Sequence, residues 1–154
     1  MDYEIRKMIA EDKKEVLSMM KDFYSSDAVY SNGSETIFEN DFQACINEDN
    51  MYLEGYVFCL AEEITGYAMI AKSFSTEFGK PCIWFEDLYL KTEHRGQGII
   101  PYFIKYITDK YPQNVFRLEV ENDNTHAVHV YKKRGFIELP YQQMIRINAN
   151  LLQY

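Results

Sequence analysis

The chain has 154 residues, of which 47% are hydrophobic, so it is long enough to bury a core without help from metals or disulfides. Its net charge of −8 disfavours a nucleic-acid partner, and its three cysteines lack the CxxC spacing of a zinc site. The N-terminal stretch is charged and no run of about 18 apolar residues follows, so we expect a cytosolic protein with no membrane partner.

The first half of the chain predicts strands and two helices. Aromatic and β-branched residues predict strands over residues 3–8, 56–62, 64–73 and 81–90, the second and third forming a hairpin. Apolar residues on one helical stripe predict helices over residues 12–23 and 37–46.

The second half alternates helix and strand. We expect helices over 99–111 and 125–134, the latter closed by Gly135, a strand over 115–121 and two short strands within 136–147. These elements predict an α/β (α+β) fold with a mixed sheet of six to seven strands and about four helices. No repeat or linker divides the chain, so residues 1–154 are expected to form one domain.

Charge is unevenly distributed along the chain. Residues 22–71 contain ten acidic side chains and no lysine or arginine, whereas residues 91–154 contain nine basic and six acidic side chains. One part of the molecule is therefore suited to a cationic ligand and another to an anionic one, although a merely solvated acidic face would give the same pattern.

Residues 86–100, EDLYLKTEHRGQGII, predict an anion site. A strand runs into a loop containing Gly96 and Gly98, and a helix follows, so unpaired backbone amides at the helix start can point at an anion. Arg95 adds a positive charge. The spacing matches neither the GxGxxG nor the GxxxxGK[ST] pattern, so dinucleotide and P-loop sites are not predicted.

Two ordered motifs resemble a known family. Residues 95–99, RGQGI, resemble the R/Q-x-x-G-x-G/A pyrophosphate loop of the GNAT superfamily of N-acetyltransferases, and residues 124–136 resemble its N-x-x-A-x-x-x-Y-x-x-x-G-F segment. IWFEDLYLKTEHRGQG is similar to the diamine and spermidine/spermine N-acetyltransferase branch. The resemblance implies a GNAT fold and acetyl-CoA as acetyl donor. It also implies these cofactor-binding residues: Leu88, Tyr89, Leu90, Arg95, Gly96, Gln97, Gly98, Ile99, Ile100 and Asn124.

One position departs from the family pattern. The last position of the loop motif is Ile100 rather than glycine or alanine, and Pro101 follows it. Proline removes one possible amide donor, and losing one charge-assisted hydrogen bond would weaken cofactor binding about ten- to a hundredfold.

The resemblance also implies a catalytic pair. Tyr131 is the expected acid for the departing thiolate, and Glu86 is the expected base for the amine, through a water. Strand alternation places Glu86 and Leu88 on one face and Asp87 on the other, so we expect Glu86 alone to face the reaction. Core packing for Tyr131 and a surface ion pair for Glu86 are the alternative roles.

The expected acceptor is a small cationic amine. Tyr24, Asp27 and Tyr30 between the first two helices, together with Glu86, could hold a polyamine, a diamine or a lysine-like amine. A peptide N-terminus or an aminoglycoside is also compatible with the many aromatic residues. The alternative of a different class is a non-catalytic CoA-binding or regulatory module. The family resemblance and the apolar residues of 139–154 further suggest a homodimer.

Histidines and cysteines carry no predicted chemistry. His126 and His129 share a helical face, but no third ligand completes a site with them or with His94, so no metal is expected. Cys82 has no basic neighbour in sequence, which disfavours a nucleophilic cysteine.

Overall fold

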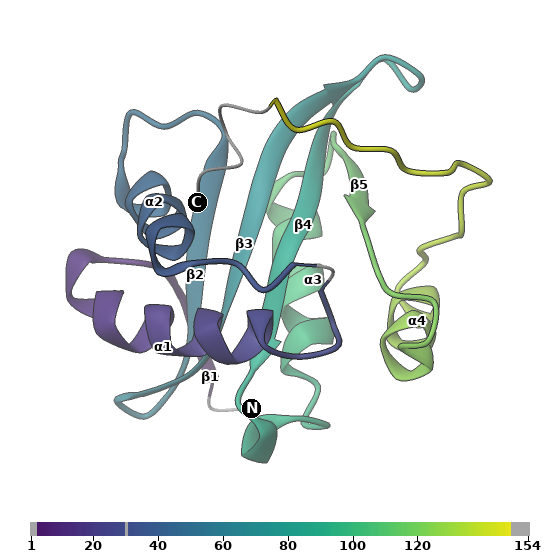
Figure 1. The fold of residues 1–154 in the computed structure, drawn as a ribbon. Helices are drawn as coiled ribbons and strands as arrows, with labels where there is room; N and C mark the ends of the chain where they lie inside the picture. The colour runs from purple at the N-terminus through teal and green to yellow at the C-terminus, as the bar shows by residue number, and fades with distance from the viewer. Residues whose placement is uncertain (1–2, 30, 149–154) are drawn as a thin grey trace.

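The computed structural model describes residues 3–29 and 31–148 of the chain (Figure 1). The elements in chain order are β1 Tyr3–Lys7, η1 Ala10–Asp12, α1 Lys13–Tyr24, α2 Glu35–Ile46, β2 Leu53–Leu60, β3 Glu63–Ser75, β4 Lys80–Leu90, η2 Thr92–His94, α3 Ile99–Lys110, β5 Val115–Leu118 and α4 Thr125–Lys133.

A mixed sheet forms the centre of the molecule. Its strand order is β1-β2-β3-β4-β5, with antiparallel pairing from β1 to β4 and parallel pairing between β4 and β5. The predicted α/β fold with four α-helices is confirmed. Within the described ranges the sheet has five strands rather than the six to seven expected.

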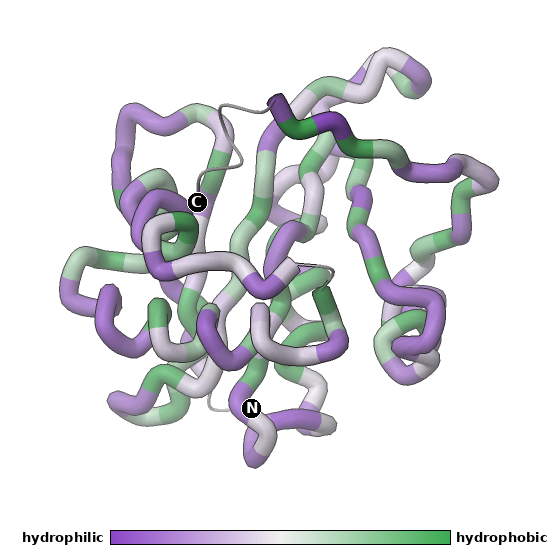
Figure 2. Tube along the Cα trace, in the orientation of Figure 1, coloured by the Kyte–Doolittle hydropathy of each residue, from purple (hydrophilic) through white to green (hydrophobic). Residues whose placement is uncertain are grey.

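Helices cover both faces of the sheet (Figure 1). Val16 and Met20 of α1 and Phe42 of α2 are fully buried against one face, and Ile104 and Ile107 of α3 are buried against the other. Hydrophobic residues accordingly follow the central strands in Figure 2. This two-sided burial stabilises the sheet as the frame on which loops are positioned.

Local signals set the helix ends. The Ser34 hydroxyl accepts a hydrogen bond from Ile37 N at 3.2 Å at the start of α2, and Asn124 Oδ1 accepts one from Ala127 N at 3.2 Å at the start of α4. Gly135, at φ 87°, follows the end of α4 as predicted, because that left-handed conformation costs glycine little.

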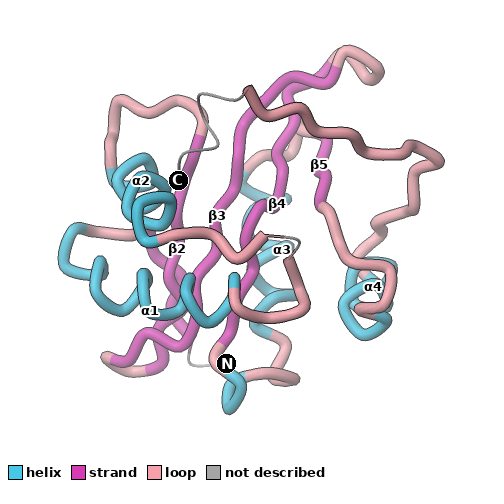
Figure 3. Tube along the Cα trace, viewed as in Figure 1, coloured by secondary structure: helices cyan, strands magenta, loops and turns pink. Residues whose placement is uncertain are grey.

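The prediction of two strands within residues 136–147 is wrong. The chain there is drawn as loop in Figure 3 and pairs with no strand among residues 3–29 and 31–148. Met144 and Ile145 are 93% and 83% exposed, so the alternating apolar residues have no surface to pack on. Pro140 lacks the N–H that a ladder requires.

None of the helices in the described part of the chain is both long and apolar enough to cross a membrane. The cytosolic location stays a prediction.

Candidate active site

The open edge of β4 is the first feature of the site. β4 pairs with β5 only from Cys82 to Phe85, opposite Val115 to Leu118. Beyond Phe85 the two strands separate, and β5 leads away to α4 (Figure 1). Within the described ranges, the stretch of β4 from Glu86 to Leu90 therefore has no strand on its β5 side. An extended ligand could add to that edge as a further strand.

A β-bulge changes the faces of β4. Met69 pairs with Asp87 but Ile70 pairs with Phe85, so Glu86 is an extra residue without a partner in β3. The bulge re-aims the strand, and Glu86 and Asp87 both line the same cavity. The prediction that only one of the two carboxylates can face the site is wrong, because simple alternation does not continue through a bulge.

That cavity is acidic. It measures about 170 Å³ and includes the carboxylates of Asp41, Glu86 and Asp87, without any lysine or arginine in its lining. The complete lining is Tyr24, Asp41, Leu53, Met69, Ala71, Glu86 and Asp87. A cationic group would be attracted into this space and an anion repelled from it.

The predicted acceptor residues separate in the structure. Tyr24 lines the cavity together with Glu86. Asp27 is exposed on the turn after α1 and is not part of the lining, and Tyr30 lies outside the described residues.

Asp87 is the most enclosed carboxylate of the cavity, with 5% of its surface exposed. The Tyr67 hydroxyl donates to its Oδ2 at 2.9 Å and the Tyr24 hydroxyl donates to its Oδ1 at 3.1 Å. Burial raises the pKa of Asp87 to about 6, and the two hydrogen bonds oppose that rise. Asp87 therefore changes charge close to neutral pH.

The pKa values of the other two carboxylates of the cavity, Glu86 and Asp41, are also raised. Loss of hydration, followed by the negative charges of Glu119 and Asp41, raises the pKa of Glu86, although its side chain reaches solvent. Burial raises the pKa of Asp41. Each of these acids holds a proton more tightly than an isolated carboxyl group does, which suits a group that must accept one.

The glycine loop leads from β4 into α3. Gly96 and Gly98 have φ values of 73° and 81°, a left-handed conformation in which a side chain would be strained. In the described chain, the amides of Gly96, Gln97 and Gly98 donate to no protein acceptor, and those of the first turn of α3 have none within the helix. These donors are available to an anion, and the anion site that the sequence predicts here stays a prediction.

Ile99 and Ile100 point away from the loop surface. Ile99 is fully buried in the core under α3, and Ile100 packs against the same core, as does Leu88. The branched side chain of Ile100 is thus accommodated by packing. The missing N–H of Pro101 falls in the first turn of α3, where no helical acceptor is lost.

Arg95 is tied to the end of β4. Its Nε donates to Leu90 O at 3.0 Å, and its guanidinium lies 5.9 Å from the centre of the Tyr89 ring. The side chain is otherwise exposed, so its remaining donors are accessible to an anion at the loop.

Tyr131 lies on α4, the helix that follows β5 (Figure 1). Its ring packs edge-to-face on Phe136 at 6.0 Å, and burial raises the pKa of its hydroxyl. Tyr131 is not part of the acidic cavity, which lies on the α1 and α2 side. Asn124 caps the same helix, so its side-chain oxygen is already engaged.

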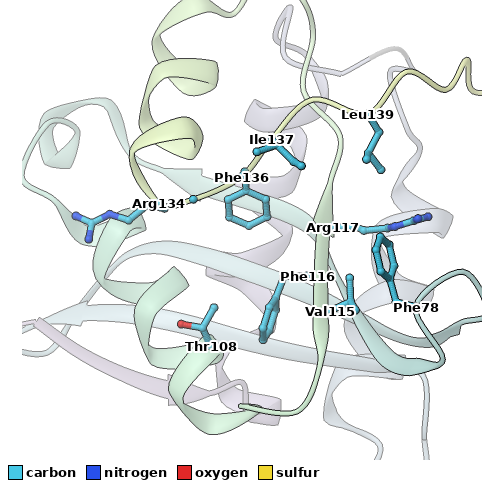
Figure 4. A pocket seen from close by; sticks show the side chains of 10 residues that line it. Phe78, Thr108, Val115, Phe116, Arg117, Arg134, Phe136, Ile137 and Leu139 are labelled. Carbon is cyan, nitrogen blue, oxygen red and sulfur yellow. The ribbon is translucent and has the colours of Figure 1, made fainter.

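A larger hollow of about 290 Å³ lies along β5 (Figure 4). Its lining is mainly apolar, with Phe116, Phe136 and Leu139 among its residues, and also includes Arg117 and Arg134. It contains none of the predicted site residues and lies toward the C-terminal end of α3, opposite the glycine loop. The acidic cavity and the loop are therefore the better candidates for chemistry.

No group of three or more His, Cys, Asp or Glu residues able to hold a metal ion occurs among residues 3–29 and 31–148.

Reasoning from sequence missed Asp41 and assigned Asp87 to the wrong face. A signal for the bulge is present in IWFEDLYL, since the apolar positions change phase between Phe85 and Leu88. Asp41 gave no such signal, because its helix carries several acids and only the packing of α2 shows which one faces the cavity.

Comparison with known proteins identifies the relatives. A family model described as "Acetyltransferase (GNAT) family" matches residues 15–136. The thialysine N-epsilon-acetyltransferase of Sus scrofa is 32% identical over 117 residues, covering 63% of this chain and 68% of that protein.

Solved structures show the same fold. A possible acetyltransferase from Clostridium difficile 630 gives a TM-score of 0.79 at 20% identity, covering 96% of this chain and 99% of that one. A predicted acetyltransferase with acetyl-CoA from Clostridium acetobutylicum gives a TM-score of 0.74 at 19% identity, covering 99% and 98%.

Proposed function

This chain belongs to the acetyltransferase (GNAT) family, and we propose that it transfers an acetyl group from acetyl-CoA to the primary amine of a small cationic acceptor. The observation that carries the choice of acceptor is the cavity with three carboxylates and no basic side chain. The relative from Sus scrofa is named for acetylation of thialysine, and this name agrees with a lysine-like amine, a diamine or a polyamine as acceptor.

The residues present fit acetyl-CoA. The amides of Gly96, Gln97 and Gly98 and the start of α3 offer donors to a pyrophosphate, and Arg95 offers a positive charge. The free edge of β4 at Leu88 to Leu90 offers backbone partners to the extended pantetheine arm. Because Ile100 packs into the core, we expect it to leave the loop surface open.

The acceptor would enter the acidic cavity. Asp87 and Asp41 attract its positive charges, and the apolar lining from Leu53 and Met69 contacts its carbon chain. An amine attacks only after losing a proton, and the Glu86 carboxylate, directly or through a water, is placed to take it. The raised pKa of Glu86 favours this transfer.

Bound acetyl-CoA supplies the activated thioester from which the acetyl group is transferred to the amine. Tyr131 holds a proton at its hydroxyl oxygen for the departing thiolate, because burial raises its pKa and keeps the phenol neutral. Direct attack in a ternary complex needs no covalent intermediate on the protein.

We further propose that residues 1–154 form one acetyltransferase domain, that the chain acts as a homodimer, and that it works in the cytosol.

An amine screen with acetyl-CoA tests the proposed acceptor class. Thiol release with spermidine, short diamines or lysine would support a cationic acceptor. Activity confined to peptide N-termini or aminoglycosides would contradict the proposed acceptor class. Binding of acetyl-CoA without turnover of any amine in the screen would favour a non-catalytic regulatory module.

A further inference from the structure

A hydrogen-bonded chain from β1 reaches into the glycine loop. The hydroxyl of Tyr3 lies 3.1 Å from Gln97 Oε1 and 3.0 Å from His94 Nδ1, and the rings of Tyr3 and His94 meet edge-to-face. The start of β1 and the segment after β4 lie side by side at the foot of the molecule in Figure 1. These contacts join segments that are 91 and 94 residues apart in the chain.

The direction of each hydrogen bond follows from the donors available. Gln97 Nε2 donates to Glu93 O at 3.2 Å, which fixes the amide so that Oε1 faces Tyr3. A tyrosine hydroxyl has one hydrogen, and here it is donated to that oxygen. The hydroxyl can then only accept from His94, which assigns the proton to His94 Nδ1. Tyr3 thus links Gln97 and His94 through one hydroxyl group.

Gln97 occupies a position where restraint matters. It lies between Gly96 and Gly98, both left-handed, and glycine gives a loop more backbone freedom than any other residue. The β4 end of the loop is held by two hydrogen bonds, from Lys91 N to Thr65 O and from Arg95 Nε to Leu90 O. The contact of Tyr3 with Gln97 holds the end that enters α3, and its contact with His94 joins that end to the segment after β4.

We propose that Tyr3 is a positioning residue for the acetyl-CoA site. Through Gln97 and His94 it holds the loop amides in the geometry that receives a pyrophosphate before the cofactor arrives. Donors that are already ordered lose less conformational entropy on binding. The inference rests on the proposed function, and it assigns part of the cofactor affinity to a side chain on the opposite edge of the sheet from β5.

Tyr3→Phe is the test, because it keeps the ring and removes only the hydroxyl. In the cofactor-free protein we expect faster amide hydrogen exchange in residues 96–100 with unchanged exchange in the sheet. Calorimetry should show acetyl-CoA binding weakened about three- to tenfold, the value of one hydrogen bond. The KM for acetyl-CoA should rise by the same factor, while kcat at saturating acetyl-CoA should not change.

Gln97→Ala provides the second arm of a double-mutant cycle. Both substitutions break the contact between Tyr3 and Gln97, so their losses of acetyl-CoA affinity should be less than additive in the double variant. Tyr52→Phe, at a tyrosine that is 74% exposed, is the matched control and should behave as the parent protein.

Three results would overturn the inference: parent-like loop exchange in Tyr3→Phe, fully additive losses in the double variant, or faster exchange spread over the whole sheet. Failure of the proposed function gives a different result from failure of this inference. A parent protein that binds no acetyl-CoA contradicts the proposed function, whereas amide hydrogen exchange in the loop of Tyr3→Phe still tests whether Tyr3 orders the loop.

Discussion

Glu86 and Asp87 are neighbours in the chain but have different surroundings. Glu86 lines the cavity and is exposed, whereas Asp87 is enclosed and accepts hydrogen bonds from Tyr24 and Tyr67. We therefore propose that Glu86 removes the proton and that Asp87 attracts the acceptor's charge. Reasoning from the sequence could name the first role from the family motif but could not find the second, which depends on the partners that folding brings to Asp87.

The acceptor KM should depend on pH through Asp87. Its raised pKa, about 6, means that the carboxylate is ionised above pH 6 and becomes neutral as the pH falls through that value. Affinity for a cationic amine should therefore fall below pH 6, which acceptor kcat/KM measured from pH 5 to 8 would show.

Two variants identify the titrating group. Asp87→Asn should lower acceptor kcat/KM about ten- to a hundredfold at pH 8 and remove the step near pH 6. Tyr67→Phe removes a hydrogen bond that lowers the pKa of Asp87, so the step should move to higher pH. A step that persists unchanged in Asp87→Asn would contradict the assignment.

Tyr131→Phe should lower kcat about a hundredfold, the usual contribution of a general acid, and leave acetyl-CoA affinity unchanged. Steady-state kinetics at saturating acetyl-CoA measure the effect. Tyr141→Phe removes a hydroxyl from an exposed tyrosine on the C-terminal segment and is the control. Equal kcat in the parent protein and Tyr131→Phe would show that another group, or water, protonates the thiolate.

At the scale of elements, periodicity predicted nearly every helix and strand up to α4 within a few residues. The bulge in β4 and the fate of residues 136–147 were missed for a common reason. A bulge is defined by the register of the neighbouring strand, and a terminal strand exists only if an edge receives it. Neither partner is visible in a local pattern of apolar residues.

A buried acid stabilises the junction of β2, β3 and α3. Glu54 is 8% exposed and accepts hydrogen bonds from Tyr56, Lys72 and Tyr111, with Lys110 Nζ 3.5 Å away. Burial alone would raise its pKa, but these donors and charges together lower it to about 2.

Glu54→Gln should lower the free energy of unfolding by about 2 to 3 kcal/mol at pH 7, because the lysines lose their buried counter-charge. A lowered pKa stabilises the folded state above the ordinary value of 4.5, and this stabilisation is lost as the pH falls toward about 2. Denaturant unfolding at pH 7 and pH 3 measures this effect. The difference in the free energy of unfolding between the parent protein and Glu54→Gln should be smaller at pH 3 than at pH 7.

Glu63→Gln is the matched control for that measurement. Glu63 is exposed and pairs with Lys91 at 3.3 Å in solvent, so its loss should change stability by less than about 1 kcal/mol. A Glu54→Gln variant as stable as Glu63→Gln would show that the network contributes nothing net.

Across the whole molecule, we expect the acidic cavity beside the middle of β4 and the loop after β4 to receive ligands of opposite charge. The acidic cavity lies on the α1 and α2 face, and the amide-rich loop starts α3 on the other. This agrees with the uneven charge of the sequence, in which the acidic half precedes β4 and the basic excess follows it. The family motifs predicted the loop for the anionic ligand residue by residue. For the cationic ligand the composition indicated a region, and of the residues named there Tyr24 and Glu86 line the cavity.

The homodimer can be tested by mass. Apolar residues of the C-terminal segment are exposed, Ile137 by 80%, Met144 by 93% and Ile145 by 83%, and a partner chain would cover them. Light scattering after gel filtration should give twice 18.3 kDa, and Ile145→Asp should shift the protein toward monomer. A parent protein that elutes at 18.3 kDa at micromolar concentration would contradict the dimer.

Binding and turnover measured on one sample test the central claim most directly. Calorimetric titration with acetyl-CoA should show micromolar binding, and addition of spermidine or a short diamine should then release one thiol for each amine acetylated. If acetyl-CoA does not bind, or if it binds but releases no CoA thiol with any cationic amine, the account of this protein as an acetyltransferase for cationic amines is contradicted.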